Sequence, residues 1–282
     1  MLALDELNAA MQAAGAEWQA GETVISALVA DLGEGNVFGL ALTDDERDEL
    51  FGAAAAAEAD SGLFAAADEL PESVDWRDGG WVTPPRFQGT CQACVAFALC
   101  ASFESRVRIG EDDSSLDLDL SEADLFFGGG RHCGQGWTFE PALVRSHDVG
   151  IGVEAAFPFT RRNQRAIAIP PAVQLIGWDA GTTIEARKVA LVNSGPIIGG
   201  MDTYEDLSYY QGGVYEYVAG GSTGKHAVCI IGYDDGPSCW IVKNSWSENW
   251  GDDGFFRIKY GECGLDSSYP FYDPAVAFLG IP

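Results

Sequence analysis

The sequence predicts an α+β fold, in which a helical first half precedes a strand-rich second half. From Cys94 to Ile109 the chain is apolar nearly all round and then amphipathic, as in a helix whose first turns are buried. After about Pro171, short runs rich in β-branched and aromatic residues are typical of strands. These runs are 173–178, 227–233, 239–243 and 254–259. Two such halves leave room for a cleft between them.

The first 70 residues differ from the rest of the chain. Leu4 to Ala14 is alanine-rich and helical in character. A capping box at Thr43 to Glu46 predicts the start of a second helix, which we expect to stop at Gly52. Because this segment offers little material for a core of its own, we expect it to lean on the remainder or to be loosely ordered. The expected division is 1–70, a helical part 71–171 and a β-rich part 172–282.

Charge limits the partners of this 282-residue chain. It has 16 basic and 43 acidic residues, which give a formal charge of −27. Nucleic acid and anionic membranes are polyanions, so neither is an expected partner. No apolar run reaches the roughly 18 residues that span a bilayer. The residues after Met1 lack the basic flank and apolar core of a signal peptide.

Three side chains form a candidate catalytic set. Cys94 stands where a helix begins, and His226 and Asn244 follow much later in the chain. A thiol at a helix N-terminus, near an imidazole, is expected to ionise near neutral pH. The imidazole would then serve as base and acid, and the amide would fix its orientation.

Each member of this set has a simpler interpretation. A CxxC pair of Cys91 with Cys94 could bind metal or act in redox chemistry, but no second CxxC or histidine pair accompanies it. A lone strand histidine such as His226 is often a satisfied core residue. Asn244 could be an ordinary turn asparagine.

Five motifs in order resemble the papain-like cysteine peptidases, from about Pro71 to the C-terminus. They are Asp75-Trp76-Arg77 with the Gly79–Pro84 stretch, Gln88–Phe97, Leu120–Leu125, His226–Tyr233 and Asn244–Phe255. The resemblance implies a two-subdomain fold, with a helical half and an antiparallel β-barrel-like half on either side of an active-site cleft. It also implies hydrolysis of peptide bonds without a metal or cofactor.

The resemblance assigns further roles. Gln88 would donate to the oxyanion together with the Cys94 backbone N–H, and Trp246 would shield the imidazole–amide bond from water. Backbone groups of Gly134, Gln135 and Gly136 would hold an extended peptide. Trp137 and Thr138 would line the pocket for the residue second before the cut. Lys225 would place a cation near the mouth.

The seven cysteines leave at least one free thiol in a monomer. The resemblance implies a Cys91–Cys133 disulfide, and it leaves Cys263 without its usual partner. Cys100, Cys229 and Cys239 are read most simply as small buried hydrophobes. The disulfide and the family suggest an extracellular or other oxidising compartment, with the cytoplasm as the alternative.

By the same resemblance, residues 1–70 are a propeptide, which either lies through the cleft as an intramolecular inhibitor or is a dispensable extension. The expected protein is a monomeric endopeptidase precursor. The frame of Cys94 departs from the family at Gln92, Ala93 and Val95, and Ser247 replaces a usual glycine. Two alternatives therefore stay open: a binding or regulatory protein with little activity, and an acyl transferase using the same triad.

Overall fold

The computed structural model describes residues 2–32, 38–62, 64 and 69–282. Its helices are α1 Leu4–Ala14, α2 Val24–Leu32, α3 Asp44–Ser61, α4 Cys94–Gly110, α5 Glu122–Gly128, α6 Phe139–Asp148 and α7 Ile184–Ser194. Its strands are β1 Gln19–Ala20, β2 Ser73–Asp75, β3 Val173–Gly181, β4 Ile197–Tyr204, β5 Tyr210–Gly212, β6 Val214–Tyr215, β7 Ser222–Asp234, β8 Cys239–Lys243, β9 Phe255–Lys259 and β10 Phe271–Phe278. Short 3₁₀ turns cover Glu205–Tyr209 and Glu262–Gly264. The expected α+β class is confirmed.

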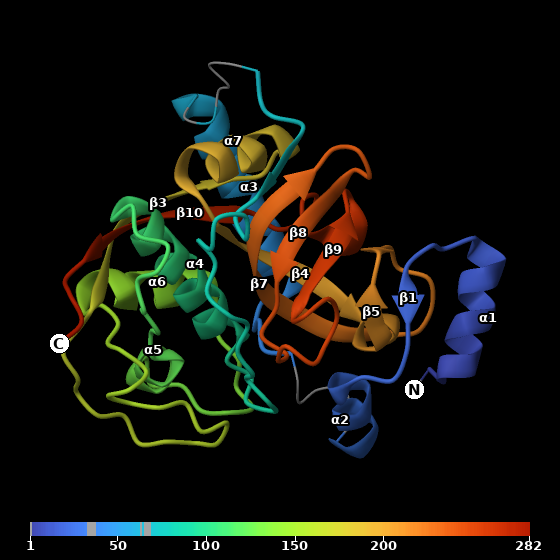
Figure 1. Ribbon diagram of the computed structural model, residues 1–282, viewed down its shortest axis with the longest axis horizontal. Coiled ribbons are helices and arrows are strands. Elements are labelled where there is room, and N and C mark those ends of the chain that lie inside the picture. Colours follow the sequence, from blue (N-terminus) through green and yellow to red (C-terminus); the bar gives the residue numbers. More distant parts are fainter. Residues whose placement is uncertain (1, 33–37, 63, 65–68) are drawn as a thin grey trace.

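Helices α4, α5 and α6 gather on one side of the molecule, and strands β4, β7, β8 and β9 lie on the other (Figure 1). The large sheet has the order β3-β10-β4-β7-β8-β9-β6, with β2 added to β7. Neighbouring strands are antiparallel except β6 and β9. The register of β4 on β7 places Gly200 opposite Ala227, Met201 opposite His226 and Asp202 opposite Lys225.

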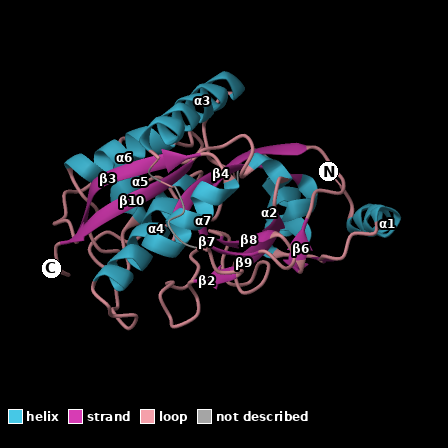
Figure 2. Cartoon of the chain, turned by 90° about the horizontal axis from the view of Figure 1, so that it is seen from above, coloured by secondary structure: helices cyan, strands magenta, loops and turns pink. Residues whose placement is uncertain are grey.

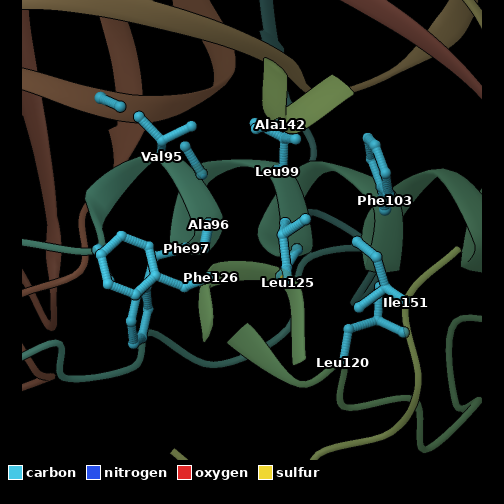
Figure 3. Packing of buried hydrophobic residues seen from close by; sticks show 14 of the residues in the cluster. Val95, Ala96, Phe97, Leu99, Phe103, Leu120, Leu125, Phe126, Ala142 and Ile151 are labelled. Atoms are coloured by element: carbon cyan, nitrogen blue, oxygen red, sulfur yellow. The ribbon is translucent and has the colours of Figure 1, made fainter. Parts of the chain in front are cut away.

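Helix α4 is the centre of the helical half. Its residues from Cys94 to Val107 are all buried, as its apolar sequence predicts. Figure 3 shows its side chains meeting those of α5, α6 and the loops around them, including Phe126 and Ala142. Fully burying one such phenylalanine contributes about 1.5–3 kcal/mol, so this packing fixes the N-terminus of α4 firmly.

The prediction that the second N-terminal helix stops at Gly52 is wrong. Helix α3 runs on to Ser61 and ends at Gly62, which has the left-handed φ of 60° that suits a C-cap. The start is as expected, because the Thr43 hydroxyl accepts a hydrogen bond from the Glu46 N–H. An internal glycine costs only about 1 kcal/mol, and the alanine run that follows Gly52 outweighs it. Helix α4 also continues through Gly110, one residue beyond the stretch that ends at Ile109 in the sequence-based prediction.

The N-terminal segment leans on the rest of the chain, as expected. Strand β1 pairs with β5, and the Trp18 ring packs between Tyr210 and Tyr215. Helix α3 lies alongside β3 and the start of α7 (Figure 2). There the Glu58 carboxylate accepts hydrogen bonds from the N–H and hydroxyl groups of Thr182 and Thr183.

Ser247 holds a strained backbone in the loop after β8, with a φ of 76°. This is the left-handed region that glycine occupies without steric cost. The resemblance expects glycine at this position, and the conformation supplies the reason. The Ser247 hydroxyl accepts a hydrogen bond of 3.2 Å from the Asn249 N–H, which offsets part of the strain.

We expect Ser247→Gly to raise the free energy of unfolding by about 0.5–1 kcal/mol, because it relieves the left-handed strain. Urea denaturation followed by fluorescence measures the change. Ser267→Gly is the matched control, since Ser267 is exposed and has no positive φ. That control should destabilise slightly through added chain entropy. A loss of stability in Ser247→Gly would show that its hydroxyl outweighs the strain.

Candidate active site

Cys94 is the first residue of α4 and has no exposed surface. Helix α4 packs against β7, the strand that carries His226. The thiol therefore lies at the junction of the two halves, at the positive end of a 17-residue helix. Its neighbour Cys91 is bonded to Cys133 with an S–S length of 2.04 Å. This confirms the expected disulfide and removes Cys91 from a CxxC dithiol.

His226 and Asn244 form the hydrogen-bonded pair expected of a base and its orienter. Nε2 of His226 lies 2.8 Å from Oδ1 of Asn244. The Trp246 ring stacks on the imidazole at 4.9 Å between centroids, with an interplanar angle of 29°. All three residues are buried. Nδ1 of His226 has no hydrogen-bond partner within the described part of the chain, so the second ring nitrogen is uncommitted.

Gln88 is held in place by hydrogen bonds of its side chain and its backbone. Its Nε2 donates to the Cys91 carbonyl at 3.2 Å, and its Oε1 accepts from the Ser245 hydroxyl at 2.6 Å. Its backbone N–H donates to the Ser245 carbonyl at 2.9 Å. The side chain is fully buried. The loop before α4 is thereby tied to the loop that carries Asn244.

Residues 39–41 of the N-terminal segment lie between the two halves. The Trp137 N–H donates to the Gly39 carbonyl at 2.8 Å, and the Ala41 N–H donates to the Trp137 carbonyl at 2.8 Å. From the other side, the Leu40 N–H donates to the Lys225 carbonyl at 3.1 Å. Leu40 and Trp137 make a parallel bridge. The segment is thus paired through its backbone with both walls of the cleft.

Gly39 approaches the loop of the candidate nucleophile very closely. A Cβ on Gly39 would lie 2.4 Å from the Gln92 carbonyl oxygen, which no side chain tolerates. A Cβ on Gly136 would meet the Gly39 carbonyl oxygen at the same distance. On the far side, the Phe38 ring lies edge-on to His226 and Trp246, at 6.1 and 5.6 Å between centroids. Residues 38–40 therefore cover the candidate catalytic groups.

This cover decides the protonation state of the site. Burial raises the pKa of the Cys94 thiol to about 11, although backbone groups of Ala227 and Gly39 oppose the change. Burial likewise lowers the pKa of His226 to about 4, against the hydrogen bond of its Nε2 to Asn244 Oδ1. Both shifts favour the neutral forms of the thiol and the imidazole. In the covered site, desolvation therefore opposes the ionisation of the Cys94 thiol that the sequence predicts.

The remaining sequence-predicted residues are distributed around the segment. Gly136 and Trp137 contact it directly, and Thr138 shares a cavity of about 420 Å³ with Leu42 and the first turns of α3. Lys225 Nζ binds Asp44 Oδ1 of the segment at 2.9 Å. Gln135 is exposed, and its N–H donates to the His132 carbonyl. Gln92 avoids the left-handed region, so its backbone does not need the usual glycine.

Sequence reasoning did not identify which residues fill the cleft. The signal that could have found them is the apolar run Phe38–Leu42 directly before the capping box at Thr43. Cys263 is a free, buried thiol, as expected, and so are Cys100, Cys229 and Cys239.

No helix among the described residues has the length and apolar character needed to cross a membrane. In the same residues, no group of three or more histidine, cysteine, aspartate or glutamate side chains is arranged to hold a metal ion.

Similar proteins share both the sequence motifs and the architecture. Mouse cathepsin S is 31% identical over an alignment of 222 residues, and the match covers 71% of this chain and 64% of the mouse protein. A digestive cysteine proteinase of Homarus americanus is 31% identical over 74% of this chain and 70% of its own length. The matches to the cathepsin S proteins of mouse, rat and cow thus span about two thirds of those proteins, or slightly less.

Solved precursor structures match almost the whole chain. Digestive procathepsin L2 of Tenebrio molitor has a TM-score of 0.79 at 26% identity and covers 96% of this chain and 88% of its own. The Trypanosoma congolense procathepsin B structure matches in fold alone, with a TM-score of 0.78 at 21% identity, 97% of this chain and 99% of its own. The family model described as papain family cysteine protease matches residues 70–272. The chain therefore belongs to the papain family of cysteine proteases.

Proposed function

We propose that this protein is the precursor of a cysteine endopeptidase, with Cys94 as nucleophile. The observation that carries the proposal is the buried His226–Asn244 pair, stacked under Trp246, beside a cleft in which the chain's own backbone is already bound like a peptide. Strand addition of this kind is how extended peptides are commonly held. The procathepsin neighbours support a precursor form.

The proposed reaction is acyl transfer through a thioester. Sγ of Cys94 forms a bond to the peptide carbonyl carbon while His226 takes up the thiol proton. The C–N bond then breaks, and His226 gives the proton to the leaving amine. Water, deprotonated by the same imidazole, hydrolyses the thioester and restores the thiol. Asn244 keeps the ring in the orientation that both transfers need.

The oxyanion of each tetrahedral intermediate would be stabilised by Gln88 Nε2 and the Cys94 backbone N–H. The hydrogen bonds of Gln88 to Cys91 and Ser245 support this role, because they hold the amide rigidly. Preorganised donors need no rearrangement when the charge develops, and loss of one typically costs about 3–4 kcal/mol.

In this proposal residues 1–70 are an intramolecular inhibitor. Residues 38–41 exclude substrate from the cleft, and the burial that they impose keeps thiol and imidazole neutral. Because the segment is tethered, its effective concentration at the cleft is high. Removal of the segment admits water, which lowers the desolvation penalty and permits the thiolate–imidazolium pair. The Cys91–Cys133 disulfide favours an oxidising compartment.

The test of the proposed function is reaction of the full-length protein with a thiol-directed epoxide and a pooled peptide substrate. After incubation at mildly acidic pH, we expect labelling at Cys94 by mass spectrometry and cleavage that Cys94→Ala abolishes. Cys100→Ala is the control, since that thiol is also buried but lies outside the site. Labelling without cleavage would favour the binding-protein alternative. An unlabelled Cys94 in a folded protein whose residues 1–70 have been removed would refute the nucleophile.

We expect Gly39→Val to open the site. The added side chain would overlap the Gln92 carbonyl, and overpacking of this kind costs about 1–3 kcal/mol. The rate of epoxide labelling at pH 7 should therefore rise about tenfold or more. Gly52→Ala is the matched control, because a Cβ there meets open space. Equal labelling rates in Gly39→Val and the unmodified protein would contradict the inhibitory role of this contact.

Glu58 should make the closure pH-dependent. Partial burial opposes its ionisation, but hydrogen bonds from Thr183 and Thr182 lower its pKa below the ordinary value of 4.5. A lowered carboxylate pKa stabilises docking above pH 4.5, and this contribution is lost as pH falls through the folded-state pKa. Glu58→Gln should therefore label about fivefold faster at pH 6, with the difference from the unmodified protein vanishing below pH 4.5. The exposed Glu49→Gln, in the same helix, should match the unmodified protein throughout.

A further inference from the structure

Arg47 is the one basic residue in the first 70 positions of the sequence. Its guanidinium lies over the Tyr269 ring, with Cζ 5.7 Å from the centroid. Its Nη1 is 4.0 Å from Oδ2 of Asp202 on β4. Two acids of its own helix, Asp44 and Asp48, also bind it, at 3.3 and 2.8 Å. The acidic segment thus places its single cation on an aromatic ring and a carboxylate of the other part of the chain.

Tyr269 and Asp202 are a preformed pair. The buried Tyr269 hydroxyl donates to Oδ1 of Asp202 at 2.7 Å. That bond fixes the Asp202 carboxylate. The Asp202 side chain keeps 26% of its surface exposed, and its Oδ2 faces Arg47. An aromatic face beside a fixed carboxylate is a favourable environment for a planar guanidinium.

The same ring forms part of the pocket that Leu40 fills. Leu40 is only 5% exposed and belongs to one buried cluster with Trp137, Ala227 and Tyr269. A Cβ on Gly200 would lie 2.6 Å from the Tyr269 ring and 2.9 Å from Leu40 Cδ2, so both rest against this glycine. Asp202 stands two residues along β4, on the same face. The ring therefore extends from the floor of the pocket to the carboxylate.

We propose that this pocket accepts an arginine side chain of the substrate once residues 1–70 have left. The aliphatic stem would take the place of Leu40, and the guanidinium would take the place of Arg47 between Tyr269 and Asp202. Long basic side chains commonly bury their stems and expose their charge in this way. This inference rests on the proposed peptidase activity, and on the assignment of the Trp137 pocket to the residue second before the cut.

Lys225 is the group that competes for this site. It is the cross-strand partner of Asp202, but in the closed structure its Nζ binds Asp44. When Asp44 leaves with the segment, Lys225 can approach Asp202 or extend into solvent. Arginine keeps an advantage over a simple ammonium ion, because it both stacks on the ring and presents a planar fork to the carboxylate.

The experiment compares fluorogenic peptide amides that differ only at the residue second before the cut: leucine, arginine and citrulline. Citrulline has nearly the shape of arginine without its charge. Full-length protein is incubated at mildly acidic pH, and active sites are counted by epoxide titration of Cys94. We expect kcat/KM to be about tenfold higher for arginine than for citrulline. Asp202→Asn should bring that ratio close to one.

Two controls distinguish the effect of a local binding site from the effect of the net charge of the whole protein. Asp117→Asn changes the net charge equally but alters an exposed residue outside the pocket, so it should keep the arginine preference. Lys225→Gln removes the competitor and should raise the arginine-to-citrulline ratio. An arginine-to-citrulline ratio near one in the unmodified enzyme would overturn the inference, and so would a ratio that Asp202→Asn leaves unchanged. In either case, cleavage of the leucine substrate would still support the proposed peptidase activity. If the epoxide labels Cys94 but none of the three substrates is cleaved, the proposed function itself fails.

Discussion

The closed site depends on one close approach, that of Gly39 to the loop that begins α4. Because Gly39 has no side chain, its backbone fits against the Gln92 carbonyl while it pairs with Trp137. This places Leu40 against the pocket at Gly200 and brings Phe38 onto His226 and Trp246. The cover of the thiol, the burial of the imidazole and the filling of the pocket all follow from this contact.

Helix α3, which follows residues 38–41, is attached to the rest of the chain mainly through polar groups. Ala54 is the buried apolar residue of this helix, and in its N-terminal half Asp44 forms an ion pair with Lys225. Its C-terminal half offers Glu58 to Thr182 and Thr183. The chain carries a formal charge of −27, and both residues 1–70 and the remainder are acidic. Long-range repulsion between the two parts therefore works against docking. The local ionic and hydrogen-bonded contacts therefore have to overcome an unfavourable field, which makes the closure sensitive to any change in their ionisation.

Much of this arrangement could be predicted from residue patterns. The apolar run after Cys94 predicts a buried helix, and the β8 strand has the expected bounds, because both are local and strongly periodic. The prediction that α3 ends at Gly52 is wrong, since a single glycine is a weak helix stop when alanines follow. The Asp202–Tyr269 pair could not be foreseen, because it joins β4 to the loop before β10 and its members are far apart in sequence. The same holds for the register that faces Asp202 with Lys225.

In the proposed mechanism, the covering of the site and the ionisation of Cys94 and His226 are coupled. A thiol that is free of the segment regains water, and the dipole of α4 and the nearby imidazole then favour its anion. Burial beneath residues 38–41 would in turn disfavour an anion at Cys94, and the Gly39 backbone group, which favours the anion, offsets only part of this effect. The open, charged form and the closed, neutral form thus exclude each other. By linkage, any interaction that stabilises the ion pair of Cys94 and His226 also weakens the docking of residues 38–41, and this reciprocity lets a contact as small as one glycine control the whole site.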